Sequence, residues 1–196
     1  MKINFSIESP LPRIVFYALF FIMTLLFTYA LAESEKSIDY YSDTQAIIER
    51  ISKDGADKVV RELSENGNFF DIWLWIMNKI SSGEDKWLHV AVALWPGTDG
   101  AATETLFLAL GEALVKAPKK VLTLFSDDFS IKGICSFPDV NDPRFDTKSE
   151  NLKELEKRRK SLLSISDRKI ESAQEQCLKC LEKSRREVSE WFNAQK

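Results

Sequence analysis

Histidine is almost absent from this sequence, because His89 is the only one among its 196 residues. Common zinc sites and the Ser-His-Asp triad both use histidine side chains. A single histidine therefore gives little basis for either kind of site. The seven glycines form no Gly-rich phosphate-binding loop. These absences predict a protein without a metal site and without a cofactor.

Strand patterns are equally scarce. Glycine and proline are few, at seven and six residues, and β-branched residues hardly ever alternate with polar ones. The apolar residues instead recur at intervals of three and four, which is typical of amphipathic helices. The sequence therefore predicts an all-α fold.

An excess of basic residues is also missing. The chain has 27 lysines and arginines against 30 aspartates and glutamates, which gives a formal charge of −3. Domains that bind nucleic acid normally present a basic face. We therefore expect no nucleic-acid partner.

One long apolar run is present, near the start of the chain, at residues 14–32. Lys2 and Arg13 precede it, and the small residues Ala30 and Ala32 end it. This pattern is typical of a secretory signal peptide, so we expect residues 1–32 to be cleaved after Ala32 and the mature protein to be periplasmic. The alternative is an uncleaved membrane anchor, because a run of roughly 20 apolar residues can span a bilayer.

Residues 33–196 are predicted to fold as a single helical domain. Its core, residues 43–126, contains six expected helices, at about 43–53, 56–65, 68–81, 84–95, 100–116 and from residue 118 onward. The fifth is apolar nearly all round, which places it at the centre of the core. Ser82 to Asp85 resembles a capping box for the fourth helix, and Thr98 or Asp99 can cap the fifth.

Residues beyond the core change in character. Residues 127–147 contain turn-forming residues such as Gly133 and Pro138 and predict a loop. Residues 148–195 are rich in charge and predict a C-terminal helical hairpin with a turn at 164–167, or alternatively one continuous helix. Two ways of packing these helices agree with the sequence. One is an array like HEAT or armadillo repeats, and the other is a compact orthogonal bundle.

The sequence contains three cysteines, Cys135, Cys177 and Cys180. An exported protein with this number is expected to form at least one disulfide. Cys177 lies on the apolar stripe of its predicted helix, so we expect it to bridge to Cys135, with Cys180 as the alternative partner. Cys177 and Cys180 also form a C-x-x-C pair, but no βαβ pattern precedes them, which disfavours a redox site.

Carboxylates and the one histidine are the candidates for chemistry. A carboxyl group in apolar surroundings can act as a general acid. Glu104 and Glu112 lie on one helix, about 12 Å apart, which is too far for the paired carboxylates of glycoside cleavage. If the protein has a catalytic site, we expect Asp99, Glu104 and His89 to form it.

The structural interpretation of the same residues is favoured. In that interpretation Asp99 caps a helix, the glutamates form ion pairs, for instance with Lys116 or Arg61, and His89 has a structural role. The charged runs at 157–160 and 185–186 are likewise interpreted as solvated helix faces, with a contact to anionic lipid headgroups as the alternative.

Four tryptophans fall within a short stretch, at positions 73, 75, 87 and 95. Trp73 lies on an apolar stripe and is expected to be buried, whereas Trp75 lies off that stripe. Exposed aromatic side chains are typical anchors of protein interfaces. We therefore take Trp75, Trp87 and Trp95 as candidates for an interface.

The stretch 55–124 resembles a group of exported proteobacterial helical proteins of unknown function. The segments that carry the resemblance include Gly55-Ala56-Asp57-Lys58-Val59-Val60, Pro96-Gly97-Thr98-Asp99, Glu104-Thr105-Leu106 and Ala109-Leu110-Gly111-Glu112-Ala113-Leu114. Together with Ile134-Cys135-Ser136, which belongs to the same pattern, it covers about 80 of the 164 residues after Ala32. The resemblance implies a periplasmic helical domain with no known activity. A looser likeness, resting on size, export and helicity, is to the helical periplasmic immunity proteins that neutralise type VI secretion amidase effectors.

These observations favour a non-enzymatic periplasmic protein-interaction module, acting as an inhibitor, an immunity factor or an assembly helper. Its partner is expected to be another envelope or secreted protein, with a membrane contact only if the signal segment is uncleaved. The alternatives are a small envelope hydrolase that uses carboxylates on peptidoglycan and an accessory protein anchored in the inner membrane.

Overall fold

The computed structural model describes residues 20, 22–24, 41, 43–65, 70–136 and 145–194. Two units are distinguished by their internal contacts, Met1–Ser42 and Asp43–Lys196. The predicted signal peptide and its cleavage site after Ala32 lie outside the described residues, apart from four helical positions at 20 and 22–24. No helix among the described residues is both long enough and apolar enough to cross a membrane.

The second unit begins with four helices. They are α2 (Thr44–Asp54), α3 (Ala56–Glu65), α4 (Phe70–Ser81) and α5 (Asp85–Leu94), and a 3₁₀ turn, η1 (Trp95–Gly97), follows α5. Asp43 caps α2 by accepting the main-chain N–H of Gln45 at 2.9 Å. Gly55 ends α2 with a φ of 90°, a conformation that a glycine adopts without steric strain. These helices confirm the expected all-α class for the described part of the chain.

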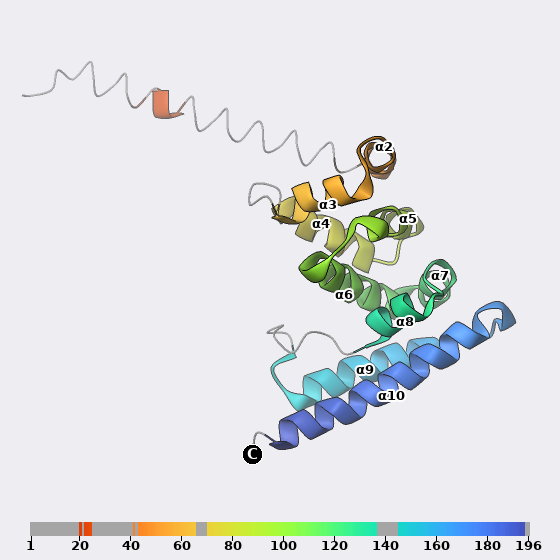
Figure 1. The fold of residues 1–196 in the computed structure, drawn as a ribbon. Helices are drawn as coiled ribbons and strands as arrows, with labels where there is room; N and C mark the ends of the chain where they lie inside the picture. Colours follow the sequence, from red (N-terminus) through yellow and green to blue (C-terminus); the bar gives the residue numbers. More distant parts are fainter. Residues whose placement is uncertain are drawn as a thin grey trace, which may run out of the picture. The chain divides into compact units, whose positions relative to one another are not determined.

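Helix α6 (Gly100–Lys116) lies at the centre of this unit. It packs against α4, α7, α8 and α9, as Figure 1 allows the reader to follow. Leu106, Leu110 and Leu114 recur every four residues along it and are fully buried. The nearly uniform apolar character of this segment correctly predicts its central place. Helix α7 (Pro118–Leu124) follows, with a proline in its first turn as predicted.

The predicted loop at 127–147 is wrong for its first part, where α8 (Asp128–Cys135) forms. Asp127 caps this helix by accepting the main-chain N–H of Ser130 at 2.9 Å. Ile131, Ile134 and Cys135 are buried at helical spacing. The apolar face gained by folding therefore outweighs the poor helix propensity of Gly133.

The C-terminal hairpin is confirmed. Helix α9 (Lys148–Leu163) and helix α10 (Glu171–Ala194) pack against each other and are joined by the 3₁₀ turn η3 (Arg168–Ile170). Figure 1 shows the two helices lying side by side, in pale and dark blue. A complete capping box between Thr147 and Glu150 begins α9. The alternative of one continuous helix is wrong, because Asp167 accepts the N–H of Lys169 and starts a new turn.

A disulfide joins Cys135, at the end of α8, to Cys177 in α10. Their Cα atoms are 5.2 Å apart, within the usual range for a disulfide. The expected pairing is confirmed, and the alternative pairing through Cys180 is wrong. Cys177 is completely buried whereas Cys180 is half-buried, so the apolar stripe identified the correct partner.

Candidate functional site

The three residues predicted for catalysis are all exposed. His89 lies on α5 and its Nδ1 is 2.8 Å from the main-chain oxygen of Asp85. The carboxylate of Asp85 also contacts Lys120 Nζ at 3.1 Å. His89 therefore belongs to an exposed polar group between α5 and α7, as the structural interpretation expected.

Asp99 directly precedes α6, and Glu104 lies in the first turns of α6. Both are therefore beyond the C-terminal end of α5, away from His89. Asp99 is the residue before α6, but its side chain makes no capping hydrogen bond. Thr98 does not cap α6 either, since its hydroxyl donates to the main-chain oxygen of Trp95 at 3.0 Å. Within the described part of the chain neither carboxylate has a hydrogen bond or an ion pair, so the expected cap by Asp99 is wrong.

Lys116 and Arg61, the bases suggested as partners for the glutamates, make other contacts. Lys116 Nζ donates to the main-chain oxygen of Ser81 at 2.8 Å. Arg61 contacts Asp57 at 3.7 Å, one turn earlier on α3. Neither groove described below is lined by Asp99, Glu104 or His89, whereas Glu112 lines both.

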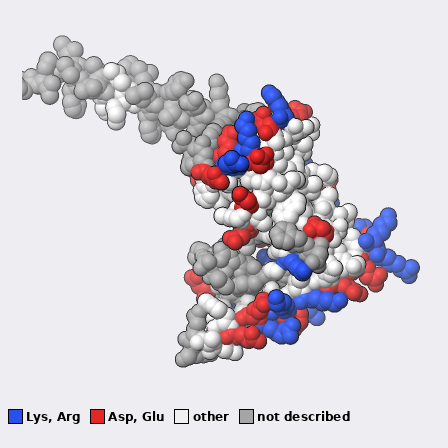
Figure 2. All heavy atoms as spheres, viewed as in Figure 1, with Lys and Arg blue, Asp and Glu red and all other residues white. Residues whose placement is uncertain are grey.

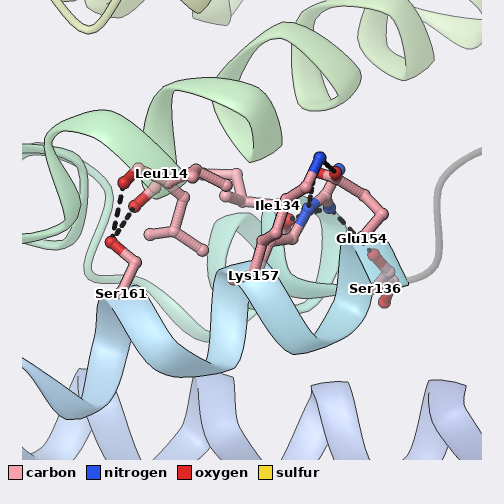
Figure 3. A network of polar contacts seen from close by, with 8 residues as sticks. Leu114, Ile134, Ser136, Glu154, Lys157 and Ser161 are labelled. Carbon is pink, nitrogen blue, oxygen red and sulfur yellow. Dashed lines mark hydrogen bonds and ion pairs between the residues drawn. The ribbon is translucent and has the colours of Figure 1, made fainter. Parts of the chain in front are cut away.

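A buried polar network lies where α6, α8 and α9 meet (Figure 3). Arg158 is only 2% exposed. Its Nη1 donates to the main-chain oxygens of Ile134 at 3.3 Å and Ser136 at 3.4 Å, and its Nε contacts Glu154 at 3.4 Å. One turn later, Ser161 donates to the main-chain oxygen of Val115 at 2.8 Å. These contacts attach α9 to α6 and α8.

Arg158 corrects the interpretation of the run 157–160 as a uniformly solvated face. Leu155, Arg158 and Leu162 recur at intervals of three and four and are all buried. This spacing could have identified the arginine as an inward residue, because one face of a helix follows that period. The lack of a side chain at Gly111 makes room for it, since a Cβ there would lie 2.6 Å from Arg158 Nη1.

One surface groove, the α6–α9 groove, has a volume of about 370 Å³. Glu112 and Lys116 line it from α6, and Glu154 and Lys157 from α9. Lys157 contacts Glu154 at 3.2 Å, and Lys116 is already bonded to Ser81. Two acidic and two basic residues line this groove, so their formal charges cancel. Since both lysines also have partners within the chain, we interpret the groove as structural.

The second groove, the α4–α6 groove, has a volume of about 200 Å³ and a different lining. Apolar side chains form much of it, namely Leu74 and Met77 of α4 with Leu108 and Ala109 of α6. Glu112 is the only charged residue that lines it. Leu74 is 45% exposed, and Phe70, four residues earlier on the same helix, is 44% exposed. This groove thus presents apolar surface that the described chain does not cover.

The predicted tryptophan interface is only partly compatible with the structure. Trp87 is 3% exposed and packs edge-on against Trp75 with 5.3 Å between ring centres, so it belongs to the core and cannot anchor a partner. Trp75 and Trp95 are half-buried. Lys79 lies over the ring of Trp75, and Trp95 packs on Phe107. The large apolar residues of this region that are exposed are instead Phe70, Leu74 and Val92.

Comparison with protein-family models, with curated proteins and with solved structures finds no match for this chain. The resemblance to exported helical proteins stays a prediction. Among the described residues, no three histidines, cysteines, aspartates or glutamates are grouped so as to hold a metal ion.

Proposed function

We propose that this protein is a non-enzymatic module that binds a partner protein through the α4–α6 groove. The observation that carries the proposal is the exposure of Phe70 and Leu74 on one face of α4, next to an apolar groove. Residues four apart on a helix are neighbours, so the two side chains form one continuous apolar strip beside the groove.

The energetics of this strip support binding. Complete burial of a leucine or a phenylalanine side chain stabilises by about 1.5–3 kcal/mol. Nearly half of each side chain is still exposed, so a partner gains about 1 kcal/mol from covering each one. Asn78, Ser81 and Thr105 line the same groove with polar atoms. An apolar centre beside polar groups is the usual composition of a protein interface.

The face drawn in Figure 2 is unevenly charged along the second unit. In the view of Figure 2, Lys, Arg, Asp and Glu gather over α2 and α3 and again over the C-terminal helices, while the band over α5 and α6 carries fewer charges. Charged residues are depleted at the centres of interfaces. On the face drawn, the middle of this unit is therefore better suited to apolar docking than either end.

The cellular setting of the proposal rests on the sequence. The signal-peptide pattern at 1–32 favours export and cleavage after Ala32, so we place the protein in the periplasm and expect an envelope or secreted protein as its partner. A helical array, the finer form of the fold prediction, fits this role because stacked helices provide extended binding surfaces. An envelope hydrolase is less favoured, because Asp99, Glu104 and His89 are exposed and line neither groove. A membrane-anchored accessory protein would require the segment 14–32 to be retained.

Affinity capture from an envelope extract, under non-reducing conditions, tests the proposal. The bait is the protein as the cell exports it, in three forms: wild type, Leu74→Asp and Leu163→Asp. Leu163 is a matched control, since it is a leucine 53% exposed on α9 and lines neither groove. We expect wild type and Leu163→Asp to retain one stoichiometric protein that Leu74→Asp loses. Equal capture by all three forms, or capture of cell-wall fragments alone, would overturn the proposal.

A further inference from the structure

The turn that joins α9 to α10 exposes an apolar side chain. We call residues 160–171, together with Lys119 of α7, the hairpin tip. Figure 1 shows this turn at the end of the hairpin, and η3 within it contacts α7. Leu163 is 53% exposed, more than any other large apolar side chain described in the second unit. The hairpin tip therefore presents apolar surface that the described chain leaves uncovered.

Hydrogen bonds fix the main chain around Leu163. Gln174 Nε2 donates to the main-chain oxygens of Leu162 at 2.7 Å and Ile165 at 3.3 Å. The N–H of Ile165 also donates to the oxygen of Leu162, at 3.1 Å. Leu162 itself is fully buried, so it anchors the turn in the core. The exposure of Leu163 is therefore set by the fold of the turn and does not reflect a frayed helix end.

Basic side chains predominate at the hairpin tip. It contains two acidic and four basic residues, namely Asp167, Glu171, Lys119, Lys160, Arg168 and Lys169. Asp167 is paired with Lys119 at 2.8 Å. Lys160, Arg168 and Lys169 are exposed, and their side chains form no ion pair within the described part of the chain. Figure 2 shows Lys and Arg gathered where Figure 1 draws this turn. The tip thus carries local positive charge on a chain whose formal net charge is −3.

This combination of features distinguishes the hairpin tip from the α4–α6 groove. The groove is lined by apolar side chains and by no lysine or arginine, whereas the tip joins an exposed leucine to several cations. A protein partner is disfavoured at the tip, because each side of a stable protein interface contributes about 20–30 residues. An anionic bilayer offers phosphate groups for basic side chains and, directly beneath them, hydrocarbon for an apolar one. The features of the tip therefore match a membrane surface.

We infer that the hairpin tip binds the surface of an anionic lipid bilayer. Leu163 enters the boundary between headgroups and acyl chains, and Lys160, Arg168 and Lys169 contact headgroup phosphates. Because the chain as a whole is acidic, anionic lipid repels most of its surface, and the molecule approaches with the tip foremost. The inference is independent of the α4–α6 groove and adds a second binding surface to the proposed function.

Sedimentation with sucrose-loaded vesicles tests this contact, using the full exported protein. One set of vesicles is phosphatidylcholine alone, and the other is an equal mixture of phosphatidylcholine and phosphatidylglycerol. We expect the protein to sediment with the anionic vesicles and to stay in solution with the neutral ones. Binding should decrease as the salt concentration rises, because salt screens exposed charges.

Paired substitutions separate the hairpin tip from a general effect of net charge. Arg168→Gln/Lys169→Gln should weaken binding to anionic vesicles about 30-fold, the effect of two basic residues near a membrane surface. The control is Arg185→Gln/Arg186→Gln, which removes the same charge from exposed positions on α10. These positions lie about 20 Å along α10 from its first residue, beyond the screening length of about 8 Å, so the control should bind like wild type.

The apolar contact has its own matched variants. Leu163→Ala should weaken vesicle binding about fivefold, and Leu163→Asp should abolish it. Leu74→Ala and Leu74→Asp should bind vesicles like wild type, since Leu74 lines the α4–α6 groove. The same four variants are expected to behave in the opposite way toward the captured envelope protein. Failure of one surface is therefore distinguishable from failure of the other.

Three results would overturn the inference. The first is equal sedimentation of wild type with neutral and anionic vesicles. The second is an equal loss of binding in the two glutamine double variants, which would leave only an effect of net charge. The third is vesicle binding by Leu163→Asp that equals wild type. In each case the proposed function stands, since it is tested by protein capture with the Leu74 variants.

Discussion

Arg158 is the residue on which the attachment of α9 depends most. Moving a guanidinium group out of water is unfavourable unless its donors find partners. Arg158 has a carboxylate, Glu154, and two main-chain oxygens at the C-terminal end of α8. The C-terminus of a helix carries partial negative charge, so this is a favourable place for a buried cation.

Gly111→Ala tests how closely this arginine is fitted. In an ordinary helix interior alanine is the better residue by about 1 kcal/mol. Here the new Cβ would lie 2.6 Å from Arg158 Nη1, so the guanidinium must move, and we expect net destabilisation of about 1–2 kcal/mol. The midpoint of urea unfolding measures it.

The control for this substitution is the same change in an Arg158→Met background. Methionine frees the space beside Gly111, so the added methyl group should no longer destabilise, and the two substitutions should show strong coupling. An increase in the unfolding midpoint of Gly111→Ala in the wild-type background would contradict the tight packing described here.

Single residues were the hardest to place from the sequence. Leu155 and Leu162 are apolar residues at helical spacing and are buried, but Arg158, which shares that spacing and burial, was grouped with its charged neighbours. Its burial depends on main-chain oxygens of α8, a helix that the sequence did not predict. Phe70 is exposed although it lies in an apolar stretch, because the hydrophobic period alone does not show which neighbour covers each position.

Helix α10 is connected to the remainder of the second unit through α8 and α9. The disulfide between Cys135 and Cys177 links α8 to α10 across 42 residues of sequence. A crosslink restricts the unfolded chain and so raises the free energy of unfolding. Because Cys177 and Cys180 lie one turn apart on α10 but differ in burial, substitutions at the two positions should have different effects.

We expect Cys135→Ala or Cys177→Ala to lower the free energy of unfolding by about 4 kcal/mol under oxidising conditions. Cys180→Ala should change it by less than about 0.5 kcal/mol. Chemical denaturation with and without dithiothreitol provides the measurement, and the reductant should bring the wild type close to the variants. A loss in Cys180→Ala as large as that in Cys177→Ala would argue against this crosslink.

The turn between α9 and α10 contains a titratable cap. The hydrogen bond from Lys119, at 2.8 Å, and the main-chain N–H of Lys169 hold the pKa of Asp167 below its ordinary value of 3.8. A carboxyl group whose pKa is lower in the folded state stabilises above the pKa of the unfolded chain. Its contribution disappears as the pH falls through the lower, folded pKa.

Asp167→Asn should therefore be less stable than wild type at neutral pH, and this difference should decrease as the pH falls below about 4. Asparagine can still cap the turn, so the substitution removes the charge and little else. Lys119→Met should produce the same pH-dependent loss, without adding to that of Asp167→Asn. A stability difference between wild type and Asp167→Asn that stays constant down to pH 2 would be inconsistent with the ion pair. Thermal unfolding across this pH range provides the data.

At the level of elements the sequence was more informative. Helices over 43–65, the central helix and the C-terminal hairpin all followed from hydrophobic period and turn residues. Helix α8 did not, because Gly133 and the nearby prolines suggested a loop, whereas the buried face of Ile131, Ile134 and Cys135 decides the structure. The capping box expected at 82–85 is absent, since Glu84 precedes α5 and makes no side-chain cap.

The second unit as a whole combines a buried central helix with an open apolar groove. Helix α6 packs against α4, α7, α8 and α9, and it also supplies one wall of each groove. A partner that docks on α4 and α6 would thus contact the central helix of the unit. The sequence predicted an interaction protein, but it placed the interface at tryptophans that are buried or half-buried.

Leu74 and the α4–α6 groove are proposed to bind the partner. The most direct test is the dissociation constant between the captured protein and four variants: Leu74→Ala, Leu74→Asp, Leu163→Ala and Leu163→Asp. Truncating a residue at the centre of an interface costs more than about 1 kcal/mol, so Leu74→Ala should weaken binding about tenfold and Leu74→Asp should abolish it. Both Leu163 variants should bind like wild type. Equal affinities across all four variants would contradict the claim.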